Sequence, residues 1–187
     1  FPGDLESGTA VPANPDNKFA NEETWSHFSP RVGVEYQASD DMMLYASYAN
    51  GFKSGGFNMR GDIGADPEAA TPFDPEIVDT FEIGFKSEPT DNLRINGTYF
   101  FSDYQDMQVT VQRAASNDNF VARVVNAGQA EIQGVELESI YAATDDLTIN
   151  LGIGYIDAEF VEFINQDPTT GDLVDQADIL AIANTPD

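Results

Sequence analysis

Four residues between positions 53 and 60 combine side chains that could bind an anionic ligand. Lys53 and Arg60 supply positive charge, Phe57 supplies an aromatic surface, and Asn58 supplies an amide. They lie in a glycine-rich stretch, where a ligand can come close to the backbone. Five acidic residues share the connection 53–76 and oppose this attraction. We therefore predict ligand contact at these four residues, and the alternative that the loop only shapes an entrance stays open.

A second group of charged residues falls at alternate positions of predicted strands: Glu82, Lys86, Arg94, Glu136 and Glu138. Glu136 and Glu138 are two residues apart, so a strand would point both to the same face. Two carboxylates can serve as the acid and base of a hydrolase, but that role depends on their separation across a cleft. We interpret all five residues as the lining of a hydrated wall that faces another part of the protein.

Catalysis and metal binding find little support in the remaining residues. His27 is the only histidine, and the chain has no cysteine, so nucleophilic catalysis and thiolate metal sites lack their usual groups. Two acidic groups could offer oxygen ligands to calcium, but neither has EF-hand spacing; they are Asp62, Asp66 and Glu68, and Asp167, Asp172, Asp175 and Asp178. We expect no enzyme, no metal site and no cofactor, with calcium in the acidic loops as an open alternative.

The elements that must position these residues have the rhythm of β-strands. In the stretch 80–86, Phe81, Ile83 and Phe85 alternate with polar residues or glycine. Strand side chains point alternately to opposite faces, so one face is apolar and the other polar. We predict strands at 30–37, 42–52, 77–87, 93–113, 120–142 and 147–158, the fourth with a bulge near 103–106.

Short and long connections alternate between these strands. Short turns rich in acidic residues are expected at 38–41, 88–92 and 143–146, and loops at 1–26, 53–76 and 159–187. Short turns on one side and long loops on the other are typical of an up-and-down transmembrane β-barrel. Six strands are too few to close such a barrel, and an open edge in lipid would leave backbone groups unpaired. We therefore expect a piece of a larger barrel.

Composition narrows the possible partners. Eight Lys and Arg against 33 Asp and Glu give a formal charge of -25, which excludes nucleic acid binding through counterion release. The absence of a long apolar run excludes a transmembrane helix, but the shorter alternating strands of a barrel remain compatible with a membrane.

Several motifs in a fixed order resemble the barrel of TonB-dependent outer-membrane receptors. The first runs from Phe28-Ser29-Pro30-Arg31 to Phe57-Asn58. The later ones are Phe73-Asp74-Pro75-Glu76, Asp103-Tyr104-Gln105-Asp106 with Met107-Gln108-Val109, and Asn126-Ala127-Gly128 with Ile132-Gln133-Gly134-Val135-Glu136. The resemblance covers residues 25–187. It implies about six strands of a barrel of about 22, with short periplasmic turns and long extracellular loops.

The resemblance also implies a function. Such receptors sit in the bacterial outer membrane, contact its lipid, and import scarce nutrients such as ferric siderophores. The energy comes from the TonB-ExbB-ExbD complex through a plug domain, which this chain lacks together with the closing strands. The five charged wall residues would then face the plug. Two alternatives are a non-transporting, adhesin-like surface barrel and a soluble acidic β-sandwich.

Overall fold

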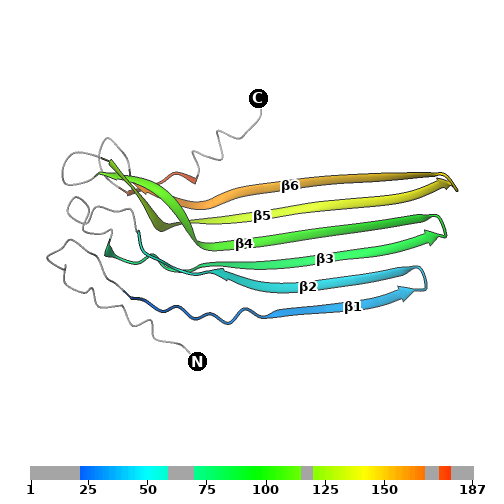
Figure 1. Ribbon diagram of the computed structural model, residues 1–187, viewed down its shortest axis with the longest axis horizontal. Helices are drawn as coiled ribbons and strands as arrows, with labels where there is room; N and C mark the ends of the chain where they lie inside the picture. Colours follow the sequence, from blue (N-terminus) through cyan, green and yellow to red (C-terminus); the bar gives the residue numbers. More distant parts are fainter. Residues whose placement is uncertain (1–21, 59–69, 115–119, 167–172, 178–187) are drawn as a thin grey trace.

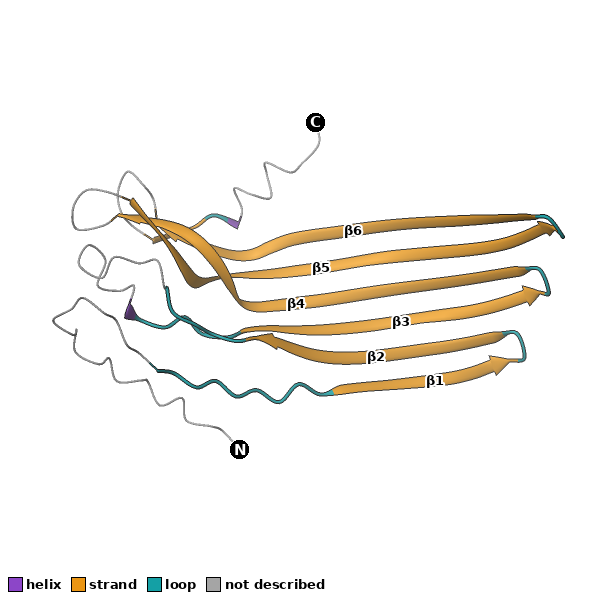
Figure 2. Ribbon diagram, viewed as in Figure 1, coloured by secondary structure: helices purple, strands orange, loops and turns teal. Residues whose placement is uncertain are grey.

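The chain folds into one antiparallel sheet. The computed structural model describes residues 22–58, 70–114, 120–166 and 173–177. Its strands are β1 (Arg31–Ser39), β2 (Met42–Lys53), β3 (Glu76–Thr90), β4 (Leu93–Ala114), β5 (Phe120–Thr144), β6 (Leu147–Gln166) and β7 (Leu173–Asp175). They pair in sequence order, so the predicted up-and-down meander is confirmed (Figures 1 and 2). No helix in the described part of the chain is long and apolar enough to cross a membrane.

The predicted short turns lie together at one end of the sheet. Residues 40–41, 91–92 and 145–146 join β1 to β2, β3 to β4, and β5 to β6, on the right of Figure 1. Each turn consists of Asp or Asn residues, whose short polar side chains favour tight turns. The longer β2–β3 and β4–β5 connections therefore lie at the opposite end.

Strand register gathers the apolar side chains on one face. One continuous row of paired residues crosses six strands: Val34, Ala46, Ile83, Tyr99, Val135 and Tyr155. These side chains are exposed; the fractions reach 65% for Val34 and 67% for Tyr155. An apolar surface of this extent is typical of a face that meets lipid or a partner.

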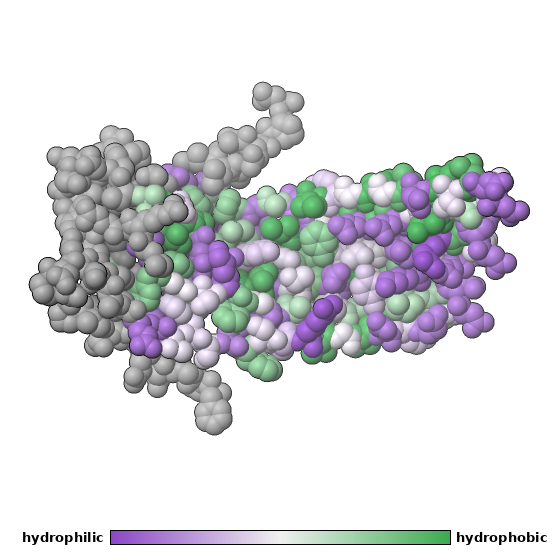
Figure 3. All heavy atoms as spheres, in the orientation of Figure 1, coloured by the Kyte–Doolittle hydropathy of each residue, from purple (hydrophilic) through white to green (hydrophobic). Residues whose placement is uncertain are grey.

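The opposite face is polar. The neighbouring row consists of Glu35, Tyr45, Gly84, Thr98, Glu136 and Gly154. Figure 3 views one face of the sheet, on which hydrophilic side chains (purple) are spread among hydrophobic and near-neutral ones. The two faces thus differ as the alternating sequence predicts.

The sheet is a single layer with very little interior. Within the described residues, the buried side chains are Val111, Ala127, Ala130, Ala177, Ser87 and Ser102, and no side chain is less than 2% exposed. A β-sandwich would bury the apolar face against a second sheet. Here that face is open, which argues against the soluble sandwich; the sheet is also not closed into a barrel by this chain.

Three glycines lie beneath aromatic rings of the adjacent strand. Tyr45 pairs with Gly84, Phe85 with Gly97, and Phe100 with Gly134. A Cβ atom on Gly84 would lie 2.5 Å from the carbonyl oxygen of Gly97 and 2.6 Å from the Tyr45 ring. These rings cover backbone that glycine would otherwise expose, a device that stabilises strands containing glycine.

The predicted bulge in β4 is present. The β4–β5 register shifts between Tyr104 and Met107 and again between Met107 and Gln108. Asp106 has a φ of 53°, the left-handed conformation that is uncommon for residues other than glycine. The bulge follows the last β3–β4 pair, Ile77 with Gln105, and Figure 1 shows the outer end of β4 curving away from β3.

The interpretation of 159–187 as a loop is wrong for its first part. β6 continues to Gln166, and a seventh strand that the sequence analysis did not predict, β7, pairs with its end. Acidic residues such as Glu159 and Glu162 suggested a loop, but a strand that is solvated on both faces tolerates them. Residues 1–21 and the middle of the predicted loop 53–76, residues 59–69, lie outside the described residues, whereas residues 22–26 are irregular as expected.

Asp175 fastens β7 to β6. Its Oδ1 atom accepts hydrogen bonds from the backbone N–H groups of Ala177 and Phe163, each at 2.9 Å. These bonds, from Ala177 first and Phe163 second, lower the pKa of the Asp175 carboxyl. This residue, one of the calcium candidates, therefore already serves as a backbone cap.

We predict that replacing Gly84 by Ala destabilises the barrel by about 1–3 kcal/mol, because the new methyl group meets backbone and ring atoms. Gly152→Ala is the matched control, since a Cβ atom at Gly152 would meet nothing within 4 Å. Urea unfolding of the full barrel in lipid vesicles measures both. Equal unfolding midpoints for the two variants would contradict the crowding at Gly84.

We also predict that the attachment of β7 depends on pH. The pKa of Asp175 is lowered in the folded chain, so its contribution is complete above the ordinary Asp pKa and is lost as the pH falls through the folded value. The protection of the Phe163 and Ala177 amides, measured against the exchange of an unfolded chain at the same pH, should fall over that window. The Asp175→Ala variant, which has no acceptor, should show weak protection of both amides at every pH; strong protection in that variant would contradict the prediction.

Candidate functional site

The base of the β2–β3 connection is closed by one β-bridge. The N–H of Gly56 donates to the carbonyl of Phe73 at 3.1 Å, and the N–H of Phe73 donates to the carbonyl of Gly56 at 2.8 Å. A Cβ atom on Gly55 would lie 2.3 Å from the Phe73 oxygen and 2.6 Å from the Trp25 ring. Glycine is therefore required here by close approach, which explains the glycine pair in the sequence.

The predicted ligand-binding residues are engaged with the protein to different degrees. Lys53 lies 3.8 Å from Glu76, and its side chain is 62% exposed. Phe57 is half-buried, with its ring centroid 6.2 Å from that of Trp25. The side-chain amide of Asn58 bonds the backbone of Val124 through both its nitrogen and its oxygen. Arg60 lies outside the described residues, as do Asp62, Asp66 and Glu68.

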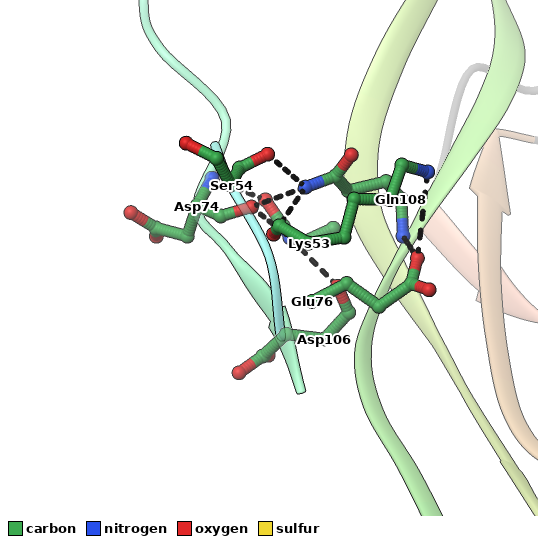
Figure 4. A network of polar contacts seen from close by, with 7 residues as sticks. Lys53, Ser54, Asp74, Glu76, Asp106 and Gln108 are labelled. Atoms are coloured by element: carbon green, nitrogen blue, oxygen red, sulfur yellow. Dashed lines mark hydrogen bonds and ion pairs between the residues drawn. The ribbon is translucent and has the colours of Figure 1, made fainter. Parts of the chain in front are cut away.

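Gln108 joins the two ends of this connection to β4. Its side-chain nitrogen donates to the carbonyls of Ser54 at 2.9 Å, Asp74 at 3.1 Å and Lys53 at 3.3 Å (Figure 4). Its backbone N–H donates to Glu76 Oε2 at 2.8 Å. An amide nitrogen has only two hydrogens, so these three acceptors share them. Gln108 thus holds both arms of the connection at one point.

No pattern in the sequence predicts this role of Gln108. The residue belongs to the polar face of the fourth predicted strand. Its side chain, however, binds the backbone carbonyls of residues that precede it in the sequence by 34 to 55 positions. A side chain that binds distant backbone leaves no signature in composition or spacing. The one signal was the family resemblance, because Asp74, Glu76, Gln108 and Asn126 lie in separate motifs that carry it. The structure brings these four residues together.

The five predicted wall residues all lie on the polar face. Lys86, Asn96 and Glu138 are cross-strand neighbours in one row, in which Asn96 lies between the other two. Glu136 is the cross-strand neighbour of Thr98 in the adjacent row. Lys86 Nζ is 5.9 Å from the centre of the Tyr45 ring, and Arg94 contacts Glu88 Oε1 at 2.6 Å. Glu82 accepts a hydrogen bond from Ser47 at 3.3 Å.

The polar face has hollows over its first strands and open space over β6. Two hollows of about 480 and 610 Å³ lie over β1 to β4 and share Met43 and Lys86 among their lining residues. Glu136 and Glu138 are exposed and lie opposite Gly154 and Gly152, where nothing lies within 4 Å of an added Cβ atom. The face therefore has room for another part of a protein.

The apolar face ends in a row of carboxylates. Asp79, Asp103, Glu131 and Glu159 are direct cross-strand partners on four successive strands. Like charges directly opposite one another are unfavourable, and they are tolerable only where water reaches them. This row therefore indicates the level at which the apolar face gives way to solvent.

Aromatic and polar groups mark the same level on β2. The hydroxyl of Tyr48 donates to Asp79 Oδ1 at 2.5 Å, and the amide of Asn50 donates to the same atom at 2.8 Å. His27 contacts Asn50 Oδ1 at 2.5 Å and lies against the Phe52 ring. Within the described residues, the hydrogen-bond partner of the His27 ring is thus the amide of Asn50. In the described residues, no group of three or more His, Cys, Asp or Glu could hold a metal ion.

The chain matches one family model over almost its whole length. The model describes the TonB dependent receptor-like β-barrel, and the match covers residues 3–184. The pesticin receptor of Yersinia pestis is 29% identical over 130 residues, and the metal-pseudopaline receptor CntO of Pseudomonas aeruginosa is 30% identical over 141 residues. These regions are 70% and 75% of this chain but only 18% of each relative.

A solved structure gives the same result. The ferric yersiniabactin uptake receptor FyuA from Yersinia pestis aligns with a TM-score of 0.57 and 27% identity, over 70% of this chain and 18% of that one. The relatives are receptors and transporters of the outer membrane, not enzymes. This chain therefore belongs to the TonB-dependent receptor family, and it forms part of the β-barrel by which such receptors lie in the outer membrane of Gram-negative bacteria.

Proposed function

We propose that this chain is part of an outer-membrane receptor that binds a ferric siderophore and imports it with energy from TonB. One observation carries the proposal: the family match is joined by relatives named as a siderophore receptor, a metal-pseudopaline receptor and a ferric yersiniabactin uptake receptor. The connection to TonB, ExbB and ExbD would run through the plug domain of the full-length receptor.

The two faces of the sheet support a place in the membrane. On β6 the apolar row runs from Leu147 to Tyr155, which at about 3.3 Å per residue spans about 26 Å. That length fits the apolar band of an outer-membrane barrel, about 25 Å tall. The band ends at aromatic side chains and the carboxylate row, so the apolar face would contact outer-membrane lipid and the upper ends of β4 and β5 would project outward.

The polar face would then line the barrel interior and meet the plug. Lys86 and Arg94 already have partners within the wall, whereas Glu136 and Glu138 lie beside the open space over Gly152 and Gly154. Glu82, Lys86 and Arg94 would shape the wall on one side. The two glutamates would contribute polar contacts to the plug on the other.

Lys53 is the described cation best placed to meet an anionic chelate. It lies at the outer end of β2, on the face that would line the interior; its ion pair with Glu76 is long, and the Lys53 side chain is exposed. Phe57, Asn58 and Arg60 belong to the same connection, and we keep them as ligand-contact candidates. The role of Asn58 would be indirect, because its amide is already bonded.

A non-transporting surface barrel is the alternative. It would keep the membrane-embedded wall but would need neither chelate binding nor TonB. No described contact favours it, and uptake measurements separate the two functions.

We predict that deleting the gene for the full-length receptor abolishes TonB-dependent uptake of radioactive iron carried by one class of siderophore. Catecholate, hydroxamate and mixed-ligand siderophores are tested one at a time in iron-starved cells. A tonB deletion should give the same loss, and the cloned receptor should restore uptake only in cells with TonB. Unchanged uptake with every chelate would contradict the import function.

We predict that Ile153→Lys lowers the stability of the membrane-inserted barrel by about 2–4 kcal/mol, the cost of a cation in the middle of the lipid-facing band. Asn150→Lys introduces the same charge on the opposite face and should cost much less. Denaturant unfolding in phospholipid vesicles measures both variants. If Asn150→Lys were the more damaging, the faces would be reversed.

We predict that Lys53→Gln weakens binding of an anionic ferric chelate by up to about fivefold, as expected for an exposed charge. The loss should shrink at high salt, because exposed charges are screened. Lys86→Gln removes the same charge near the short turns and serves as the control. Equal affinities of the Lys53→Gln receptor and the parent at low salt, measured by fluorescence quenching, would exclude Lys53 from the site.

A further inference from the structure

Two asparagines tie the β2–β3 connection to the β4–β5 hairpin. Asn58 belongs to the connection, and its side-chain amide pairs with the backbone of Val124 in β5. It donates to the Val124 carbonyl at 3.0 Å and accepts from the Val124 N–H at 2.7 Å. In this way the amide takes the place of a neighbouring strand.

Asn126 repeats the arrangement in the opposite direction. It belongs to β5, and it pairs with the backbone of Asp74 in the connection, accepting from the N–H at 2.7 Å and donating to the carbonyl at 2.9 Å. Its nitrogen also donates to the carbonyl of Asp106, at the bulge of β4, at 2.7 Å. One side chain therefore links the connection, the bulge and β5.

The two asparagine contacts hold opposite arms of the β2–β3 connection against β5. Asn58 lies just after Gly56, and Asp74 lies just after Phe73, so the Gly56–Phe73 bridge joins the two positions that contact β5. The partners are separated in sequence by 66 and 52 residues. A displacement of one arm from β5 would pull the other through the bridge, so the two contacts should break and form together.

We propose that Asn58 and Asn126 are positioning residues that make the β2–β3 connection and the β4–β5 hairpin one extracellular unit. The connection carries the ligand-contact candidates, so a ligand bound by it would be held in a fixed place relative to the hairpin. That consequence rests on the function proposed above. The coupling of the two elements does not, and it can be tested without a ligand.

The test is hydrogen exchange at two amides in the full-length receptor, read by mass spectrometry with fragmentation. The Val124 N–H reports on Asn58, and the Asp74 N–H reports on Asn126. In the Asn126→Ala variant we expect exchange at Asp74 to accelerate about tenfold, and exchange at Val124 to accelerate as well, although Asn126 does not contact Val124. Asn58→Ala should give the reciprocal result.

Gln129→Ala is the matched control, because Gln129 is an exposed amide on the same strand. It should change neither amide. Acceleration confined to the amide that loses its own partner would overturn the coupling and leave two independent local contacts. If the alanine variants do not insert, exchange in the parent decides: fast exchange at Val124 and Asp74 would overturn the proposal.

A distance measurement gives a second readout. This chain has no cysteine, so nitroxide labels at Thr71→Cys in the connection and Thr110→Cys in β4 add the only thiols within it; both positions are exposed. We expect a narrow distance distribution in the parent and a broadened one in Asn58→Ala/Asn126→Ala. The Asn126→Asp variant keeps the acceptor for the Asp74 N–H and should retain part of the narrow distribution. An unchanged width in the double variant would also overturn the proposal.

Discussion

Strand pairing is the interaction on which this structure depends, because the sheet has no second layer. A backbone N–H or C=O in lipid has no water to bond, so it must find its partner in the next strand. β2 to β5 meet this requirement through neighbours on both sides. Side chains then only decide which face is apolar, which explains why so few of them are buried and why the apolar face is so open.

The same requirement explains the polar junction at the outer end. β6 pairs with β5 only as far as Gly128, after which β6 turns to β7. Beyond that residue one edge of β5 has lost its partner strand, and the amide of Asn58 bonds the Val124 backbone there. Where the strand ends but the hairpin continues, asparagine and glutamine amides thus substitute for a strand, since each offers a donor and an acceptor as a peptide group does.

The meander was predictable from the sequence because its causes are local. Alternation between Phe81, Ile83 and Phe85 assigns the faces of β3, and pairs of Asp or Asn residues assign the turns. The extension of β6 past Ala158 was not predictable in this way, because a strand solvated on both faces loses its alternation. The junction was less predictable still, since Gln108 and Asn126 bind backbone groups contributed by residues far away in the chain. Beside the ligand candidate Phe57, the glycine pair indicated a backbone that tolerates no side chain. The structure shows the cause, which is the close approach of Trp25 and Phe73.

The placement of charge, more than its total, decides whether so acidic a chain can occupy a membrane. Acids at residues 40–41, 91 and 145–146 lie in the short turns, and the row Asp79, Asp103, Glu131 and Glu159 lies beyond the aromatic side chains at the other end. Between Leu147 and Tyr155 the apolar face carries no charge on β6, and Asp157 follows on that face next to Glu159 of the carboxylate row. Glu136 and Glu138 project to the opposite face. The repulsion within the carboxylate row falls where water screens it, and at Asp79 the hydroxyl of Tyr48 and the amide of Asn50 offset it further. A formal charge of -25 is thus compatible with an uninterrupted apolar band, because the sequence confines carboxylates to the levels and the face that water can reach.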